Sequence, residues 1–372
     1  MLIGVPKEIK THEYRVGMTP GSVAEAVHAG HPVIVETGAG GGIGADDEAY
    51  RRAGAEIVAS GSEVFKRAEL IVKVKEPQPA ERALLIPGQI LFTYLHLAPD
   101  AAQTCDLMAS GAVCIAYETV TDASGGLPLL RPMSQVAGRM AVQAGAHCLE
   151  KEAGGRGILL GGVPGVAPAR VVILGGGVVG ANATQIAVGT GADVTVLDNN
   201  AETLRRLADT VGLGLKTVYS TRQAVAEQVI AADLVIGAVL VPGGAAPKLV
   251  TKDMVKAMRA GSVIVDVAID QGGCTETSRP TTHAEPTYIV DGVVHYCVAN
   301  MPGAVAHTSA HALNNATLPF VLAIADKGYR RALYEDPHLM QGLNVHGGKV
   351  TCKPVAQAHG LPFEDPRAAI GV

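Results

Sequence analysis

The stretch RVVILGGGVVGANATQIAVGTGADVTVLD, residues 170–198, contains the pattern that decides the fold. Residues 171–174 are apolar and mostly β-branched, which predicts a buried strand, and a GxGxxG motif follows directly at 175–180. The small residues of 181–188 predict a helix, and 193–197 predict a second strand that ends in an aspartate. A strand, a glycine turn, a helix and a strand in this order predict half of a dinucleotide-binding α/β domain.

Each glycine of the motif has a physical role in such a domain. Gly175 permits the tight turn, Gly177 lets the backbone approach a pyrophosphate without a Cβ, and Gly180 allows the helix to pack closely on the strand. The pyrophosphate then lies at the positive N-terminus of the helix, beside Val178 and Val179. We therefore expect these five residues to bind the cofactor, although a glycine turn with a purely structural role is the alternative.

The acidic residue that ends the second strand selects the cofactor. Asp198 stands 18 residues after Gly180, where a carboxylate accepts hydrogen bonds from the adenosine ribose hydroxyls. The same carboxylate would repel the 2′-phosphate of NADP, and the next basic residues are Arg205 and Arg206, about two turns into the following helix. The sequence therefore predicts NAD.

Two downstream segments, 232–244 and 261–273, each resemble a strand that runs into a loop. Ligands of open α/β sheets bind beyond the carboxyl ends of the strands, so we expect these loops to approach the nicotinamide half of the cofactor. The residues placed there are Ala238, Val239, Leu240, Val267, Ala268 and Asp270.

The rest of the chain alternates strand-like and helix-like segments, which is typical of α/β layers and mostly parallel sheets. Strands are expected at 2–6, 31–38, 70–77, 89–97 and 112–120, and helices at 20–29 and 46–54. Long helical patterns run over 131–154 and from Thr308 to Lys327, the latter despite Pro319.

These patterns predict two Rossmann-like domains joined by the two long helices. The NAD-binding domain, 130–306, is expected to be inserted between the first part of a substrate domain, 1–129, and its C-terminal part, 307–372. Two domains agree with a chain of 372 residues.

Composition excludes several classes of protein. The formal net charge is −5, and the sequence contains no basic patch that would bind nucleic acid. No apolar run reaches the roughly 20 residues of a membrane span. The N-terminus is charged within seven residues and does not resemble a signal peptide. The six cysteines form no CxxC pair, which favours reduced thiols in a cytoplasmic protein, and no ligand cluster calls for a metal.

Four polar residues are candidates for the chemistry. Arg15 precedes a predicted helix start, and Lys75, His96 and Asp270 are each placed at the end of a predicted strand, where active-site groups gather. Each could instead be structural. Lys75 could be solvated, since Lys73 shares its face by the period of two, His96 could be a satisfied histidine, and Asp270 could cap a turn.

With these residues collected, the sequence resembles the alanine dehydrogenases, a family that includes the NAD-binding part of the proton-translocating transhydrogenases. The resemblance covers essentially the whole chain. It is strongest in GVPKEIKTHEYRVGMTP (4–20), VKVKEP (72–77), YLHLA (94–98), PMSQVAGRMA (132–141), 171–198, VDVAIDQGG (265–273) and VANMPGAV (298–305). Thr11, Gly17 and Thr190 depart from the residues usual in the family.

The resemblance implies roles for the candidates. Arg15 and Lys75 would hold the substrate carboxylate, His96 would be the general acid and base, and Asp270 would assist proton transfer. The family fold implies an active-site cleft between the two domains and, commonly, a homohexamer. The residues implied to line the NAD cleft are Ser134, Asp198, Ser220, Val239, Asp270 and Met301.

The reaction expected from the resemblance is the interconversion of L-alanine, water and NAD with pyruvate, ammonium and NADH. Histidine suits the proton transfers because its ordinary pKa is about 6.5. Two alternatives remain open at this point. One is a transhydrogenase subunit that binds NAD and docks to a membrane partner, and the other is an NAD-sensing protein without turnover.

Overall fold

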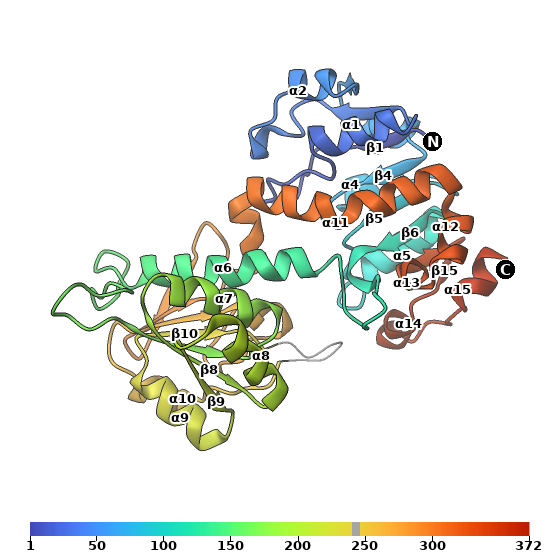
Figure 1. The fold of residues 1–372 in the computed structure, drawn as a ribbon. Helices are drawn as coiled ribbons and strands as arrows, with labels where there is room; N and C mark the ends of the chain where they lie inside the picture. Colours follow the sequence, from blue (N-terminus) through green and yellow to red (C-terminus); the bar gives the residue numbers. More distant parts are fainter. Residues whose placement is uncertain (240–245, 372) are drawn as a thin grey trace. The chain divides into compact units, whose positions relative to one another are not determined.

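The computed structural model describes residues 1–239 and 246–371 (Figure 1). The chain forms two compact units, one of Met1–Met133 with Val305–Val372 and one of Ser134–Ala304. The expected boundaries, 129/130 and 306/307, stand close to these positions.

The chain passes from one unit to the other at two places. The first is in the first turn of helix α6, Arg131–Cys148, and the second is in the 3-10 turn η4, Met301–Val305. Helix α11, Ala306–Lys327, follows η4 and continues through Pro319, as the sequence predicts.

The first unit is built on an eight-stranded sheet of order β15-β14-β6-β5-β4-β1-β2-β3. Six of its strands are parallel, and the C-terminal segment adds two antiparallel strands at one edge. The strands are β1 (Ile3–Val5), β2 (Val33–Glu36), β3 (Glu56–Val58), β4 (Leu70–Val72), β5 (Ile90–Thr93), β6 (Val113–Ala116), β14 (Leu343–His346) and β15 (Lys349–Val350).

Helices cover both faces of this sheet. The remaining elements of the unit are α1 (Pro20–His28), η1 (Gly41–Ile43), α2 (Asp47–Arg52), α3 (Gly61–Arg67), α4 (Pro79–Arg82), α5 (Ala101–Ser110), η2 (Tyr117–Thr119), α12 (Tyr329–Glu335), α13 (Pro337–Met340), α14 (Lys353–His359) and α15 (Pro366–Ile370). Helix α1 begins where the sequence predicts, because Thr19 caps it and Pro20 stands in its first turn.

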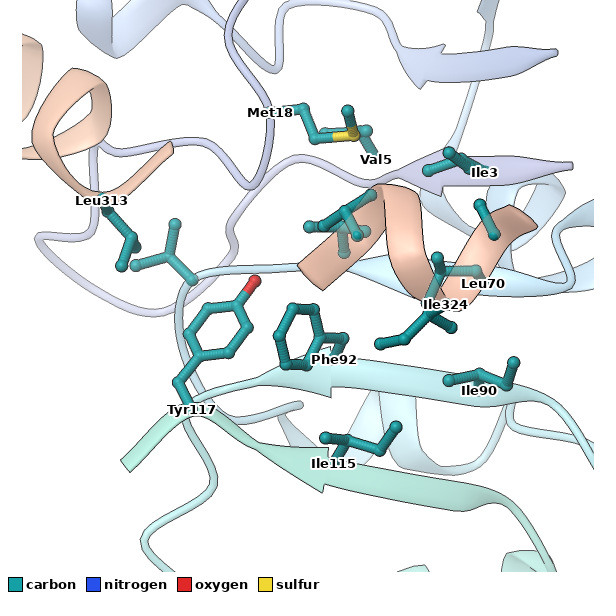
Figure 2. Close-up of a cluster of buried hydrophobic side chains, with 14 of the residues drawn as sticks. Ile3, Val5, Met18, Leu70, Ile90, Phe92, Ile115, Tyr117, Leu313 and Ile324 are labelled. Carbon is teal, nitrogen blue, oxygen red and sulfur yellow. The ribbon is translucent and has the colours of Figure 1, made fainter. Parts of the chain in front are cut away.

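Two apolar clusters fill the space between helices and sheet. Alternate strand residues point to opposite faces, so Leu70 and Val72 pack with α1 and α11, whereas Ile71 packs with α3, α5 and α14. Figure 2 shows the first cluster, in which the ring of Phe92 meets Tyr117 edge to face with 4.4 Å between the ring centroids. Burial on both faces explains why these strands are continuous runs of apolar residues.

The second unit is built on a seven-stranded sheet of order β12-β13-β11-β10-β7-β8-β9 within the described residues. All strands are parallel except β12. The strands are β7 (Arg170–Leu174), β8 (Asp193–Asp198), β9 (Leu215–Tyr219), β10 (Leu234–Gly237), β11 (Val263–Asp266), β12 (Thr287–Val290) and β13 (Val293–Tyr296). The helices besides α6 are α7 (Val178–Gly189), α8 (Ala201–Val211), α9 (Arg222–Ala231) and α10 (Lys252–Ala257), with η3 at Val267–Gln271.

Two predicted helix bounds are wrong. Helix α6 ends at Cys148 rather than near Gly154, because the chain turns there and the Gly157 N–H donates to the Leu149 carbonyl at 2.8 Å. Helix α7 begins at Val178 rather than Ala181, since Gly177 is its N-cap residue.

Several predicted strands are also too long, and three of these carry candidate residues. Strand β4 ends at Val72, β5 at Thr93 and β11 at Asp266. Lys75, His96 and Asp270 therefore do not end strands but lie in the segments that follow them. In the described part of the chain, no helix is both long and apolar enough to cross a membrane.

Candidate functional site

The glycine motif of the second unit follows β7 directly. Gly175 has a φ of +98°, and a Cβ built on it would lie 2.9 Å from the carbonyl oxygen of Ala238. The backbone at this position therefore requires glycine for its conformation and for the close approach of the neighbouring strand end.

The other two glycines of the motif face different surroundings. A Cβ on Gly180 would lie 1.8 Å from the carbonyl oxygen of Gly175, so α7 crosses the turn at a distance that only glycine allows. A Cβ on Gly177 would meet no atom within 4 Å among the described residues, so this residue borders open space at the N-terminus of α7. Open space beside the first turn of a helix, with Val178 and Val179 next to it, is where an anion can bind.

Asp198 ends β8, the strand next to β7, and its carboxylate contacts the glycine turn. Its Oδ2 accepts a hydrogen bond from the Gly176 N–H at 2.7 Å, and its Oδ1 accepts one from the Asn200 N–H at 2.8 Å. The carboxylate is thereby fixed in orientation while the residue stays partly exposed. Gly176 was not singled out from the sequence, and its position between two motif glycines was the available signal.

Five of the expected cofactor residues stand at the carboxyl ends of five neighbouring parallel strands. Gly175, Asp198, Ser220, Val239 and Val267 end or follow β7, β8, β9, β10 and β11 respectively. The sheet order changes direction between β7 and β10, which is the switch point where doubly wound sheets bind ligands. Leu240 lies outside the described residues.

Three other expected residues differ in exposure. Ser134 is partly buried in the first turn of α6, whereas Met301 is 3% exposed and packs in the core of the second unit. Asp270 is exposed in η3.

Asp266 is a buried carboxylate that the sequence did not single out. It ends β11 and accepts hydrogen bonds from the Cys274 N–H at 2.9 Å and the Ser278 hydroxyl at 2.6 Å. It fixes the loop that carries Asp270. The available signal is its place directly after the apolar run 263–265.

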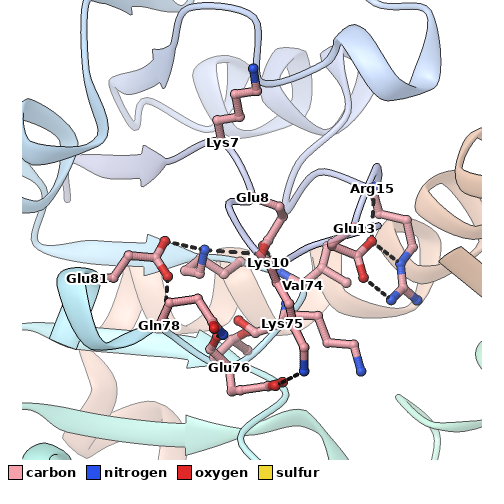
Figure 3. Close-up of polar contacts among 12 residues, drawn as sticks. Lys7, Glu8, Lys10, Glu13, Arg15, Val74, Lys75, Glu76, Gln78 and Glu81 are labelled. Atoms are coloured by element: carbon pink, nitrogen blue, oxygen red, sulfur yellow. Dashed lines mark hydrogen bonds and ion pairs between the residues drawn. The ribbon is translucent and has the colours of Figure 1, made fainter. Parts of the chain in front are cut away.

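In the first unit, Arg15 is buried and paired with Glu13. The guanidinium donates from Nε to Glu13 Oε1 at 2.6 Å and from Nη2 to Oε2 at 2.5 Å, a bidentate geometry (Figure 3). Burial raises the pKa of Glu13, but the contacts with Arg15 outweigh this and hold that pKa below its ordinary value. The Arg15 Nη1 lies 3.0 Å from the sulfur of Met133.

Lys75 is a partly buried cation of the same region. Its ammonium has no hydrogen-bond or ion-pair partner within residues 1–239 and 246–371, and its side chain ends without a marked contact in Figure 3. The adjacent carboxylate of Glu76 is held instead by Lys10. Burial lowers the pKa of Lys75, and Arg15 and Lys10 lower it further. Lys73, two residues earlier, is fully buried.

His96 follows β5 and is exposed. Its φ of +50° is unusual for a residue with a side chain, and its N–H donates to Glu118 Oε1 at 2.6 Å. Its ring stacks on that of Tyr94, with 5.8 Å between the centroids and an interplanar angle of 5°. The Tyr94 hydroxyl donates to the Leu129 carbonyl at 2.6 Å, so the surface that carries the imidazole is fixed.

Arg15, Lys75 and His96 thus lie in the segments that follow β1, β4 and β5, three consecutive parallel strands of one sheet. The cofactor candidates gather at the strand ends of the other unit. A doubly wound sheet with a glycine turn and a terminal acid defines the class of dinucleotide-binding α/β proteins.

The chain belongs to the alanine dehydrogenase/PNT family. The N-terminal domain model of that family matches residues 4–137, and its C-terminal domain model matches residues 141–353. The alanine dehydrogenase of Halomonas elongata is 62% identical, with 100% of each chain covered. The alanine dehydrogenase of Bacillus subtilis is 54% identical, with 100% of this chain and 98% of that protein covered.

Solved structures agree with this membership. An L-alanine dehydrogenase has a TM-score of 0.95 at 54% identity, covering 97% of this chain and 99% of the other. A transhydrogenase from Sinorhizobium meliloti has a TM-score of 0.82 at 25% identity, covering 95% and 99%.

Proposed function

We propose that the protein is an NAD-dependent L-alanine dehydrogenase, which catalyses the reversible oxidative deamination of L-alanine to pyruvate and ammonium. The observation that carries the proposal is the full-length identity of 62% to an alanine dehydrogenase. The geometry supports it, because an uncommitted ammonium at Lys75 suits the carboxylate of a small amino acid.

The residues of the second unit fit NAD. Gly177 leaves open space at the N-terminus of α7 for a pyrophosphate, and Asp198 is a fixed acceptor for ribose hydroxyls. Val178 and Val179 of the first turn of α7 would complete the binding site, with Ser220, Val239 and Val267 from the neighbouring strand ends. Ser134, Leu240 and Met301 would also contribute to it. When bound, the nicotinamide supplies the acceptor for the hydride that leaves the α-carbon.

The residues of the first unit would bind and protonate the substrate. Lys75 would hold the carboxylate as a point charge, with Arg15 beside it, already oriented by Glu13. His96 would take the proton that water loses on adding to the imine and return it in the reverse direction. Asp270 would assist the proton transfer.

The expected assembly is a homohexamer in the cytoplasm, and its support is membership of the family. Among the described residues, no group of three or more His, Cys, Asp or Glu side chains is placed to hold a metal ion.

The test is an assay at 340 nm with NADH, ammonium and pyruvate. We expect NADH loss that requires both ammonium and pyruvate, with slower loss for glyoxylate and 2-oxobutyrate. Loss with pyruvate alone would indicate a 2-hydroxyacid dehydrogenase. An absence of loss while NADH still binds by fluorescence titration would overturn the proposal.

A further inference from the structure

Next to the main chain of Lys75 lies a cluster of three buried ionisable side chains, Glu8, Lys73 and Glu81, that the proposed mechanism does not use. Lys73 is 0% exposed, and its ammonium lies 2.7 Å from Glu81 Oε1 and 3.2 Å from Glu8 Oε2. Figure 3 labels the two carboxylates. Burial lowers the pKa of Lys73, but the two carboxylates outweigh this and raise it above its ordinary value. Lys73 therefore stays charged.

The two carboxylates of the cluster differ in what their second oxygen does. Glu8 Oε1 accepts a hydrogen bond from the Val74 N–H at 2.7 Å and a longer one from the Lys75 N–H at 3.4 Å. Glu81 Oε2 instead accepts from the Gln78 N–H at 2.7 Å, where it caps the start of α4. Glu8 thus connects the charge cluster to the main chain of Lys75, and Glu81 does not.

The opposite side of this main chain is held by β5. The Thr93 hydroxyl donates to the Lys75 carbonyl at 3.0 Å, and the Tyr94 N–H donates to the Val74 carbonyl at 3.3 Å. Lys75 is consequently fixed at its N–H and at its carbonyl, although β4 has already ended at Val72.

Stability alone does not explain such a cluster. Desolvation of buried charges offsets most of their mutual attraction, so a buried ion group contributes little more than apolar residues of the same volume. A chain that leaves its strand, however, needs new partners for its N–H groups, and Glu8 supplies them with an acceptor that Lys73 holds in place.

We infer that Glu8 is a positioning residue for Lys75: its carboxylate, which Lys73 contacts, sets the main chain from which the Lys75 ammonium reaches the substrate carboxylate. The expected effect of Glu8 on substrate binding rests on the proposed function. The placement of Lys75 itself is independent of turnover.

The test compares Glu8→Ala with Glu81→Ala, a matched control. Both variants remove one carboxylate from the same ammonium, but only Glu8→Ala removes the acceptor of the Val74 and Lys75 N–H groups. We expect Glu8→Ala to raise the KM for pyruvate about tenfold or more, as expected for one lost interaction of about 1.4 kcal/mol. The KM for NADH should stay within about twofold, as should both KM values for Glu81→Ala.

A third variant covers the possibility that the single variants do not fold. The combination Glu8→Gln, Lys73→Met and Glu81→Gln removes every charge of the cluster but keeps an amide oxygen as the acceptor. We expect it to have a KM for pyruvate near that of the wild type. An increase of about tenfold in this variant, or equal effects of the two alanine variants on that KM, would overturn the inference.

A readout without turnover separates this inference from the proposed function. Reductive methylation with formaldehyde and cyanoborohydride, followed by peptide mass spectrometry, measures the reactivity of Lys75. Glu8→Ala should change the methylation rate of Lys75 while Glu81→Ala leaves it near the wild-type rate, whether or not the enzyme oxidises alanine. Equal Lys75 rates in the two variants would contradict the positioning role. Lack of pyruvate turnover in the wild type would contradict only the function.

Discussion

The carboxylate of Asp198 accepts a hydrogen bond from the main-chain N–H of Gly176 at 2.7 Å. This bond links the end of β8 to the glycine turn after β7. The second oxygen of the carboxylate is held by the Asn200 N–H. An acid that is fixed by two N–H groups keeps its orientation, so binding does not have to order it.

This relationship predicts the effect of Asp198→Ala on cofactor choice. The KM for NAD should rise roughly tenfold to a hundredfold, because a hydrogen bond to a charged group contributes about 1.5–3 kcal/mol. The preference for NAD over NADP should shrink, since the carboxylate that repels a 2′-phosphate is gone. Kinetics with both cofactors measure this. Asp209→Asn, on the exposed face of α8, is the control and should change neither value. An unchanged NAD-to-NADP ratio in Asp198→Ala would contradict the role.

Gly180→Ala should destabilise the second unit and weaken NADH binding. The new methyl group would lie 1.8 Å from the Gly175 carbonyl oxygen, so the turn and α7 must move apart. Overpacking of this kind costs about 1–3 kcal/mol or more. Gly189→Ala in the last turn of α7 is the control, because its Cβ would meet no described atom within 4 Å. Thermal unfolding and NADH fluorescence should separate the two variants, and equal melting temperatures would refute the close-packing argument.

His96→Ala should remove most turnover and spare NADH binding. Loss of a positioned acid and base lowers kcat about 10²- to 10⁴-fold, whereas the cofactor residues belong to the other unit. Steady-state kinetics and a fluorescence titration measure the two effects. His28→Ala, on the exposed last turn of α1, should behave as the wild type. Turnover that persists in His96→Ala would exclude the assigned role.

The lowered pKa of Lys75 predicts a pH dependence of substrate binding. The ammonium form binds a carboxylate, and it is lost as the pH rises through a pKa that lies below the ordinary 10.5. The affinity for oxamate, an unreactive analogue of pyruvate, should therefore fall with rising pH before pH 10.5 is reached. Calorimetric titration over this range measures it. Lys75→Arg should move the fall to higher pH, and an affinity independent of pH up to 10.5 would contradict the lysine's role.

The lowered pKa of Lys75 also makes the free energy of unfolding depend on pH. Because the unfolded chain binds the Lys75 proton more tightly than the folded chain, this group destabilises the fold below the lowered pKa. Its penalty is relieved as the pH rises from that pKa to 10.5.

The sequence predicts the local parts of this site and misses those that depend on distant contacts. The turn at Gly175, Gly180 and Asp198 lies within one strand–helix–strand unit, so spacing alone places it. Strand β4 ends at Val72, and the N–H of Val74 donates to the Glu8 carboxylate instead of to a neighbouring strand. Glu8 is far away in the chain, 65 residues before its partner Lys73. The alternation of residues within the strand cannot show where β4 ends.

The buried carboxylate of Asp266 is missed for the same reason. Both residues fit the pattern of a strand end, but only the packing of the loop at 274–278 shows that Asp266 is buried and Asp270 exposed. The pairing of Arg15 with Glu13 was likewise missed, although the two are only two residues apart, because a sequence does not show which direction a side chain takes.

The most direct test of the central claim is to follow the hydrogen on the α-carbon. The protein is incubated with L-alanine deuterated at C2 and with NAD, and the reduced cofactor is analysed by mass spectrometry. The account predicts one deuterium in each NADH formed, together with equal amounts of pyruvate and ammonium. Reduced cofactor without deuterium, or no reduction of NAD by L-alanine, would contradict it.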